Sequence, residues 1–71
     1  MPIAAPIPVS AAVLVWARAE SGYSQEQVAD KLGVKVERLA EWESGERQPI
    51  MRQIEALARI YHRPLSLFFQ P

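Results

Sequence analysis

The stretch of sequence that decides the fold is residues 23–49, YSQEQVADKLGVKVERLAEWESGERQP. Ser24 is a residue type that caps helix N-termini, and Gln27 three positions later completes an S-x-x-Q capping box. Gly33 can adopt the left-handed backbone conformation that ends a helix. The pattern therefore predicts a short, well-capped helix over residues 24–32.

A second short helix follows this glycine turn. It is predicted to begin near Lys35 or Val36 and to run to Glu43, with Ser44-Gly45 as its stop. Two short helices joined by a glycine turn are the pattern of a helix-turn-helix, and ordinary helical hairpins share it. The helices over residues 24–32 and 35–43 are the candidate functional unit.

Helical patterns continue on both sides of this pair. Ser10 is an N-cap for a first helix that should stop at residues 21–22. A fourth helix is predicted to begin at residue 49 or 50 and to end before Pro64, and residues 65–69 should form a short apolar helix or turn that closes the core. No strand-like alternation occurs, so the predicted fold class is all-α: a compact bundle of four to five short helices.

The organisation of the chain is simple. Residues 1–9, MPIAAPIPV, are predicted to form a Pro-rich N-terminal arm, and residues 10–71 a single domain. The unbroken apolar stretch of residues 9–17 is far shorter than the roughly 20 residues that span a bilayer. We therefore expect a soluble, cytoplasmic protein with no membrane partner.

Composition excludes several classes of function. The 71 residues contain no cysteine, one histidine (His62) and one aspartate (Asp30). Thiol catalysis, hydrolytic metal sites and Ser–His–Asp triads need more than this, so neither an enzyme nor a cofactor is expected. The net charge of zero argues against strong sequence-independent binding to nucleic-acid phosphates.

Two runs of residues carry a specific resemblance. S-Q-E-Q-V-A-D-K-L-G-V at residues 24–34, followed by L-A-E-W-E-S-G-E-R-Q-P at residues 39–49, closely resembles the Cro/C1-type helix-turn-helix, or XRE family. The resemblance covers roughly residues 11–69. It implies a lambda-repressor-like fold and sequence-specific binding to double-stranded DNA by a transcriptional regulator, with a homodimer as a possible assembly.

A narrower resemblance concerns the ends of the chain. MPIAAPIPVS at residues 1–10, ARAESG at residues 17–22 and RPLSLFF at residues 63–69 resemble the N-terminal domain of regulators fused to ImmA/IrrE-type metallopeptidases. This resemblance implies that the chain is the recognition part of a longer protein, with a C-terminal peptidase domain as a possible partner. Free-standing antitoxins share the same domain, so a toxin is another possible partner.

The family resemblance assigns candidate DNA contacts position by position. The helix over residues 35–43 would be the recognition helix, with its outer face in the major groove. Two of the central readers are glutamates, which can accept a hydrogen bond from cytosine N4 but repel phosphate. The predicted base readers are Val36, Glu37, Arg38 and Glu41; Lys35, Ser44, Arg47, Gln48 and Arg52 should lie near phosphates, and Gln25 should contact a phosphate or a base edge.

Charge distribution leaves an alternative open. Residues 20–43 carry six acidic and three basic side chains, whereas residues 44–71 carry four basic and two acidic ones. The alternative function is a protein-interaction module of a longer metallopeptidase-linked or toxin–antitoxin regulator with weak DNA binding. Val15 and Trp16 point away from the expected core and form a possible interaction surface, covered either by the Pro-rich arm or by a second chain or domain.

Two further residues have a structural interpretation. In the resembling family an arginine of the first helix pairs with the glutamate of the W-E dipeptide, and Arg18 and Glu43 stand at those positions. The resemblance implies that this pair locks the first helix to the recognition helix. Trp42 is expected to pack in the core.

Overall fold

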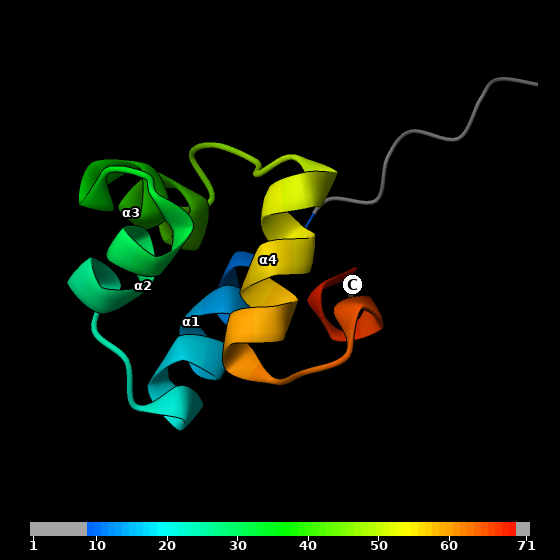
Figure 1. The fold of residues 1–71 in the computed structure, drawn as a ribbon. Coiled ribbons are helices and arrows are strands. Elements are labelled where there is room, and N and C mark those ends of the chain that lie inside the picture. The colour runs from blue at the N-terminus through cyan, green and yellow to red at the C-terminus, as the bar shows by residue number, and fades with distance from the viewer. Residues whose placement is uncertain (1–8, 70–71) are drawn as a thin grey trace, which may run out of the picture.

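A computed structural model describes residues 9–69 of the chain and shows an all-helical bundle (Figure 1). The predicted Pro-rich arm lies outside the described residues except for Val9. The described elements contain no strand, as predicted. They are α1 (Ala11–Ser21), α2 (Gln25–Leu32), α3 (Val36–Ser44), α4 (Met51–Tyr61) and a C-terminal 3₁₀ helix, η1 (Leu65–Phe69).

Side-chain caps begin the first two helices. The Ser10 hydroxyl accepts a hydrogen bond from the backbone N–H of Val13 at 3.3 Å. At α2 the capping box is confirmed: Ser24 Oγ accepts from Gln27 N at 3.1 Å, and Gln27 Oε1 accepts from Ser24 N at 2.8 Å. These bonds satisfy backbone donors that have no partner within the helix, so both helices begin where the sequence predicts.

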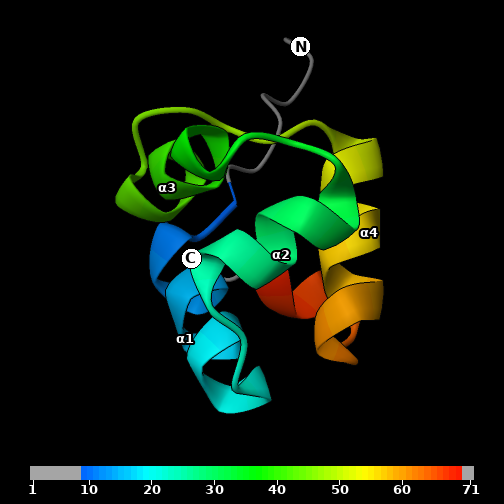
Figure 2. The ribbon, with the colours of Figure 1, turned by 60° about the vertical axis from the view of Figure 1, so that its left-hand side comes forward.

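The glycine turn sets the angle between α2 and α3. Gly33 has φ 74°, in the left-handed region, and its N–H donates to Asp30 O at 3.2 Å. Val34 N then donates to Ala29 O at 3.0 Å, which completes a Schellman-type end to α2. The chain reverses here, so α3 packs against α2 as Figures 1 and 2 show.

The start of α3 lies within the predicted range of Lys35 or Val36, and its end lies one residue beyond the predicted Glu43. Lys35 is the N-cap, with extended ψ of 147°, and the helix begins at Val36. Ser44 remains helical because the left-handed residue that ends α3 is Gly45, whose N–H donates to Trp42 O at 3.3 Å. Ser24 is the N-cap of α2, as predicted. Ile50 is the N-cap of α4, so this helix begins one residue after the later of its two predicted starts.

One apolar core holds all five elements together. Leu14 and Ala17 from α1 meet residues from the other helices, and Trp42 is buried as predicted. The η1 turn closes this core with Phe68, which is fully buried, and its backbone carbonyl accepts a hydrogen bond from Ser10 N at 2.9 Å. The remaining fully or largely buried core residues are Val9, Val28, Ala29, Leu39, Ile54, Leu57, Ala58 and Tyr61.

Tyr61 is a polar exception in this core. Its hydroxyl oxygen is buried, and no hydrogen bond within residues 9–69 reaches it. Burial is the main cause that raises the pKa of the phenol well above its ordinary value of 10, and the negative charge of Glu43 adds to this effect. The folded protein therefore keeps Tyr61 protonated, whereas an unfolded chain would ionise it near pH 10.

This difference predicts a pH dependence. The folded state binds the Tyr61 proton more tightly, so its contribution to stability is fully present below pH 10 and is lost as pH rises above that value. Tyr61→Phe should flatten this alkaline decline, and at neutral pH it should be neutral or stabilise by about 1 kcal/mol because an unpartnered hydroxyl is removed. Urea melts between pH 7 and pH 11 measure both effects, and an unchanged alkaline decline would contradict them.

Candidate nucleic-acid interface

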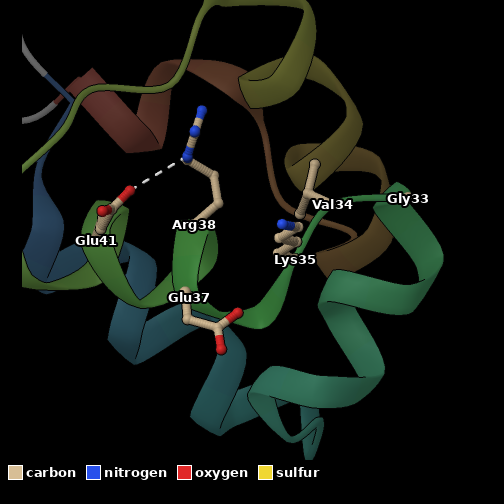
Figure 3. A pocket seen from close by; sticks show the side chains of 6 residues that line it. All are labelled: Gly33, Val34, Lys35, Glu37, Arg38 and Glu41. Carbon is tan, nitrogen blue, oxygen red and sulfur yellow. Dashed lines mark ion pairs between the residues drawn. The ribbon is translucent and has the colours of Figure 1, made fainter.

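A surface pocket lies beside the turn between α2 and α3. Its volume is about 410 Å³, and it opens on the outer side of α3 (Figure 3). Four of the predicted DNA contacts, Lys35, Glu37, Arg38 and Glu41, line it together with Gly33 and Val34. The helix-turn-helix geometry therefore gathers these side chains at one exposed place.

Within this group Glu41 is held by two arginines. Its Oε1 atom lies 3.2 Å from Arg38 Nε in an ion pair and accepts a hydrogen bond from Arg47 Nε at 3.1 Å. Arg38 is one helical turn before Glu41, whereas Arg47 reaches back from the loop after α3. Figure 3 shows Arg38 with its Nε facing Glu41 and Glu37 pointing in the opposite direction. The three-residue cluster carries a net positive charge.

Three other predicted contacts have different partners. Gln25 directs its amide nitrogen inward, where Nε2 donates to Glu43 Oε1 at 2.9 Å. Gln48 Oε1 accepts a hydrogen bond from the backbone N–H of Val9 at 2.9 Å, which ties the start of the described chain to the loop after α3. Ser44 Oγ donates locally, with Glu41 O at 3.1 Å and Glu46 Oε1 at 3.0 Å as acceptors.

The remaining predicted contacts, Val36 and Arg52, do not line the pocket. Val36 is half-buried in the first turn of α3. Arg52 is exposed in the first turn of α4 and does not line the pocket. The structure thus assembles one compact group around Glu41, and it leaves Gln25, Gln48 and Arg52 outside that group.

Arg18 and Glu43 join α1 to α3 in a bidentate ion pair. Arg18 Nε lies 2.7 Å from Glu43 Oε2, and its Nη2 donates to Oε1 at 3.1 Å. Arg18 Nη1 also donates to the backbone carbonyl of Tyr23 at 3.1 Å. The hydrogen bonding to Glu43 raises the pKa of the Arg18 guanidinium, although burial acts in the opposite direction. The Glu43 carboxylate also accepts the bond from Gln25, so α1, α2 and α3 share one polar junction.

This junction changes the charge that α3 presents to solvent. The Glu43 side chain is only 5% exposed and its charge is matched by Arg18. Apart from Glu43, the charged side chains of residues 35–47 are three cations, Lys35, Arg38 and Arg47, and three carboxylates, Glu37, Glu41 and Glu46. The acidic surplus of residues 20–43 is therefore not concentrated on this face.

The possible interaction surface on α1 is open in the described structure. Val15 is 38% exposed and Trp16 is 46% exposed. The guanidinium carbon of Arg63 lies 5.2 Å from the centre of the Trp16 ring, so a cation–π contact covers part of the indole. No local sequence pattern indicates this contact, because Arg63 lies 47 positions after Trp16 in the chain. The Pro-rich arm, one of the two covers proposed for Trp16, lies outside the described residues except for Val9.

A comparison with known protein families agrees with the helix-turn-helix arrangement of α2 and α3. A family model described as helix-turn-helix matches residues 14–68, well over half of the chain. No curated protein and no solved structure gave a significant match. No helix within residues 9–69 is long and apolar enough to cross a membrane. The matching family is one of DNA-binding domains rather than catalytic ones. The chain belongs to the Cro/C1-type (XRE) helix-turn-helix family of DNA-binding regulators.

Proposed function

We propose that this domain binds double-stranded DNA sequence-specifically, as part of a transcriptional regulator. The observation that carries the proposal is the outer face of α3, which holds Glu37, Arg38 and Glu41 at an exposed pocket beside the helix-turn-helix turn. In this mode of binding α3 would enter the major groove, and α2 would cross the backbone. Two copies would read half-sites about 34 Å apart as a two-fold dimer.

The candidate residues divide into two roles. Side chains on the outer face of α3 would touch base edges and set the preferred sequence, because only base contacts carry sequence information. Cations and amides around this face would hold phosphates and set the affinity for all sequences. The proposed readers are Val36, Glu37 and Arg38, and Glu41 lines the same pocket as the last two. The proposed phosphate contacts are Gln25, Lys35, Ser44, Arg47, Gln48 and Arg52.

Arg52→Ala tests the phosphate role. A plot of log affinity against log salt concentration has a negative slope, and each lost phosphate contact reduces the magnitude of this slope by about 1. Arg52→Ala should therefore weaken binding to every duplex alike and make the slope less steep. Arg59→Ala is the matched control, since Arg59 is also exposed on α4 but lies two turns farther from α3. Fluorescence anisotropy on labelled genomic fragments at several salt concentrations gives both slopes. Equal slopes for the two variants would remove Arg52 from the interface.

A second candidate function is supported by the exposed pair Val15 and Trp16. Large apolar side chains at the surface often mark contacts with another protein. The domain could then serve as an interaction module in a longer metallopeptidase-linked or toxin–antitoxin regulator, with weak DNA binding. Binding that shows no preference for any duplex sequence would favour this second function over the first.

A further inference from the structure

We propose that Arg38 is a specificity-determining residue of the interface, that it reads a guanine, and that Glu41, which also binds Arg47, positions its guanidinium. This inference rests on the proposed DNA binding and deepens it. It also assigns Glu41 a different role from the one expected on sequence grounds, where its carboxylate was a candidate reader of cytosine. The ion cluster around Glu41 Oε1 is the observation that carries it.

The ion pair with Glu41 uses the Nε atom of Arg38, which is not one of the two terminal nitrogens of its guanidinium. The ion pair engages Nε of Arg38 at 3.2 Å. Among residues 9–69, Arg38 donates no hydrogen bond from its Nη1 or Nη2 atoms, and its side chain is 45% exposed. These two nitrogens form the end of the fork that binds O6 and N7 of guanine with two parallel hydrogen bonds, the commonest specific contact in the major groove.

Glu41 is a poor reader of bases in this arrangement. Its Oε1 atom already serves two cations, Arg38 and Arg47. A cytosine amino group would have to compete with both of them for the same carboxylate. The carboxylate instead fixes the direction of Arg38, and Arg47 supplies the second positive charge, so that the cluster as a whole attracts DNA rather than repelling it.

Position in the fold separates the roles of the two arginines. Arg38 rises from α3 itself and lines the pocket with Lys35 and Glu37. Arg47 belongs to the loop after α3 and does not line the pocket. Exposed ion pairs add little to folding stability, so variants of this cluster keep the fold and report on binding.

The test uses the full chain and a duplex with the sequence that the wild-type protein enriches from a random DNA pool. Each guanine is replaced in turn by 7-deazaguanine, which removes only the N7 acceptor. Wild type should lose about 10-fold in affinity at one guanine of each half-site, the order expected for one charge-assisted hydrogen bond. Arg38→Ala should bind the modified and unmodified duplexes equally. Arg59→Ala, the matched control, should keep the wild-type sensitivity.

Glu41→Gln tests the positioning role. It should reduce the sensitivity to 7-deazaguanine at the same guanine while the melting temperature stays unchanged, a pattern that a purely structural role would not produce. The inference is overturned if Arg38→Ala remains as sensitive as wild type at every guanine, or if wild type is insensitive at all of them. Full wild-type sensitivity in Glu41→Gln would overturn the role of Glu41. A wild-type protein that enriches no sequence at all would instead contradict the proposed function itself.

Discussion

Arg18→Ala should unfold a large fraction of the protein at 25 °C. The substitution removes both hydrogen bonds that Arg18 donates to Glu43, whose side chain is only 5% exposed. Breaking a fully buried pair from one side costs about 3–5 kcal/mol, because the remaining charge is left uncompensated, and this partly buried pair should cost about the lower end of that range. A core of this size supplies only about 3–5 kcal/mol of net stability. The expected loss is therefore comparable to the whole free energy of unfolding.

A double-mutant cycle separates this pairing from other effects of the substitution. Urea melts of Arg18→Ala, Glu43→Gln and the double variant, with sucrose added equally to keep the variants folded, give the three free energies. The free energy of unfolding should fall less in the double variant than the sum of its falls in the two single variants. The reason is that the second substitution removes the charge left without a partner by the first. Arg59→Ala should change stability by less than about 0.5 kcal/mol. Strictly additive losses would show that the pair is not coupled.

Phe68→Ala should be the most damaging substitution in the C-terminal turn. Phe68 is fully buried and its ring centre lies 6.4 Å from that of Tyr61 on α4. Removing a buried phenyl ring costs about 3–5 kcal/mol, since apolar contact is lost and a cavity remains. The η1 turn would then no longer close the bundle, although its backbone bond from Ser10 could persist.

Ser66→Ala provides the control for this prediction within the same turn. Ser66 is exposed, so its truncation should shift stability by no more than about 0.5 kcal/mol. Thermal melts followed by circular dichroism compare the two variants directly. If Phe68→Ala were as stable as Ser66→Ala, η1 would not be part of the cooperative core.

Local sequence signals predicted the helices well. The capping box at Ser24 and Gln27 and the glycine stops involve residues three or fewer positions apart, so their chemistry is readable along the chain. The one-residue error at the end of α3 arose because the sequence alone does not show which of the two residues Ser44 and Gly45 leaves the helical conformation. The position of Arg18 relative to Glu43 was expected only through resemblance to a family.

Side-chain partners that depend on tertiary packing could not be predicted in this way. Gln25 and Gln48 were predicted to contact DNA through their side-chain amides. In the structure Gln25 hydrogen-bonds to Glu43, 18 positions away, and Gln48 hydrogen-bonds to Val9, 39 positions away. The spacing of Arg38 and Glu41 did offer a signal, since residues three apart share a helix face. The approach of Arg47 to the same carboxylate required the loop after α3 to fold back, and no local pattern shows that.

The central claim is that the outer face of α3 reads DNA sequence, and selection from a random duplex pool tests it most directly. Glu37 is the best residue to vary, because its exposed carboxylate points away from the Arg38–Glu41 pair. Wild type should enrich one motif, and Glu37→Gln should enrich a motif that differs at one position in each half-site, with an unchanged melting temperature. Failure of the folded wild-type protein to enrich any motif would contradict the claim.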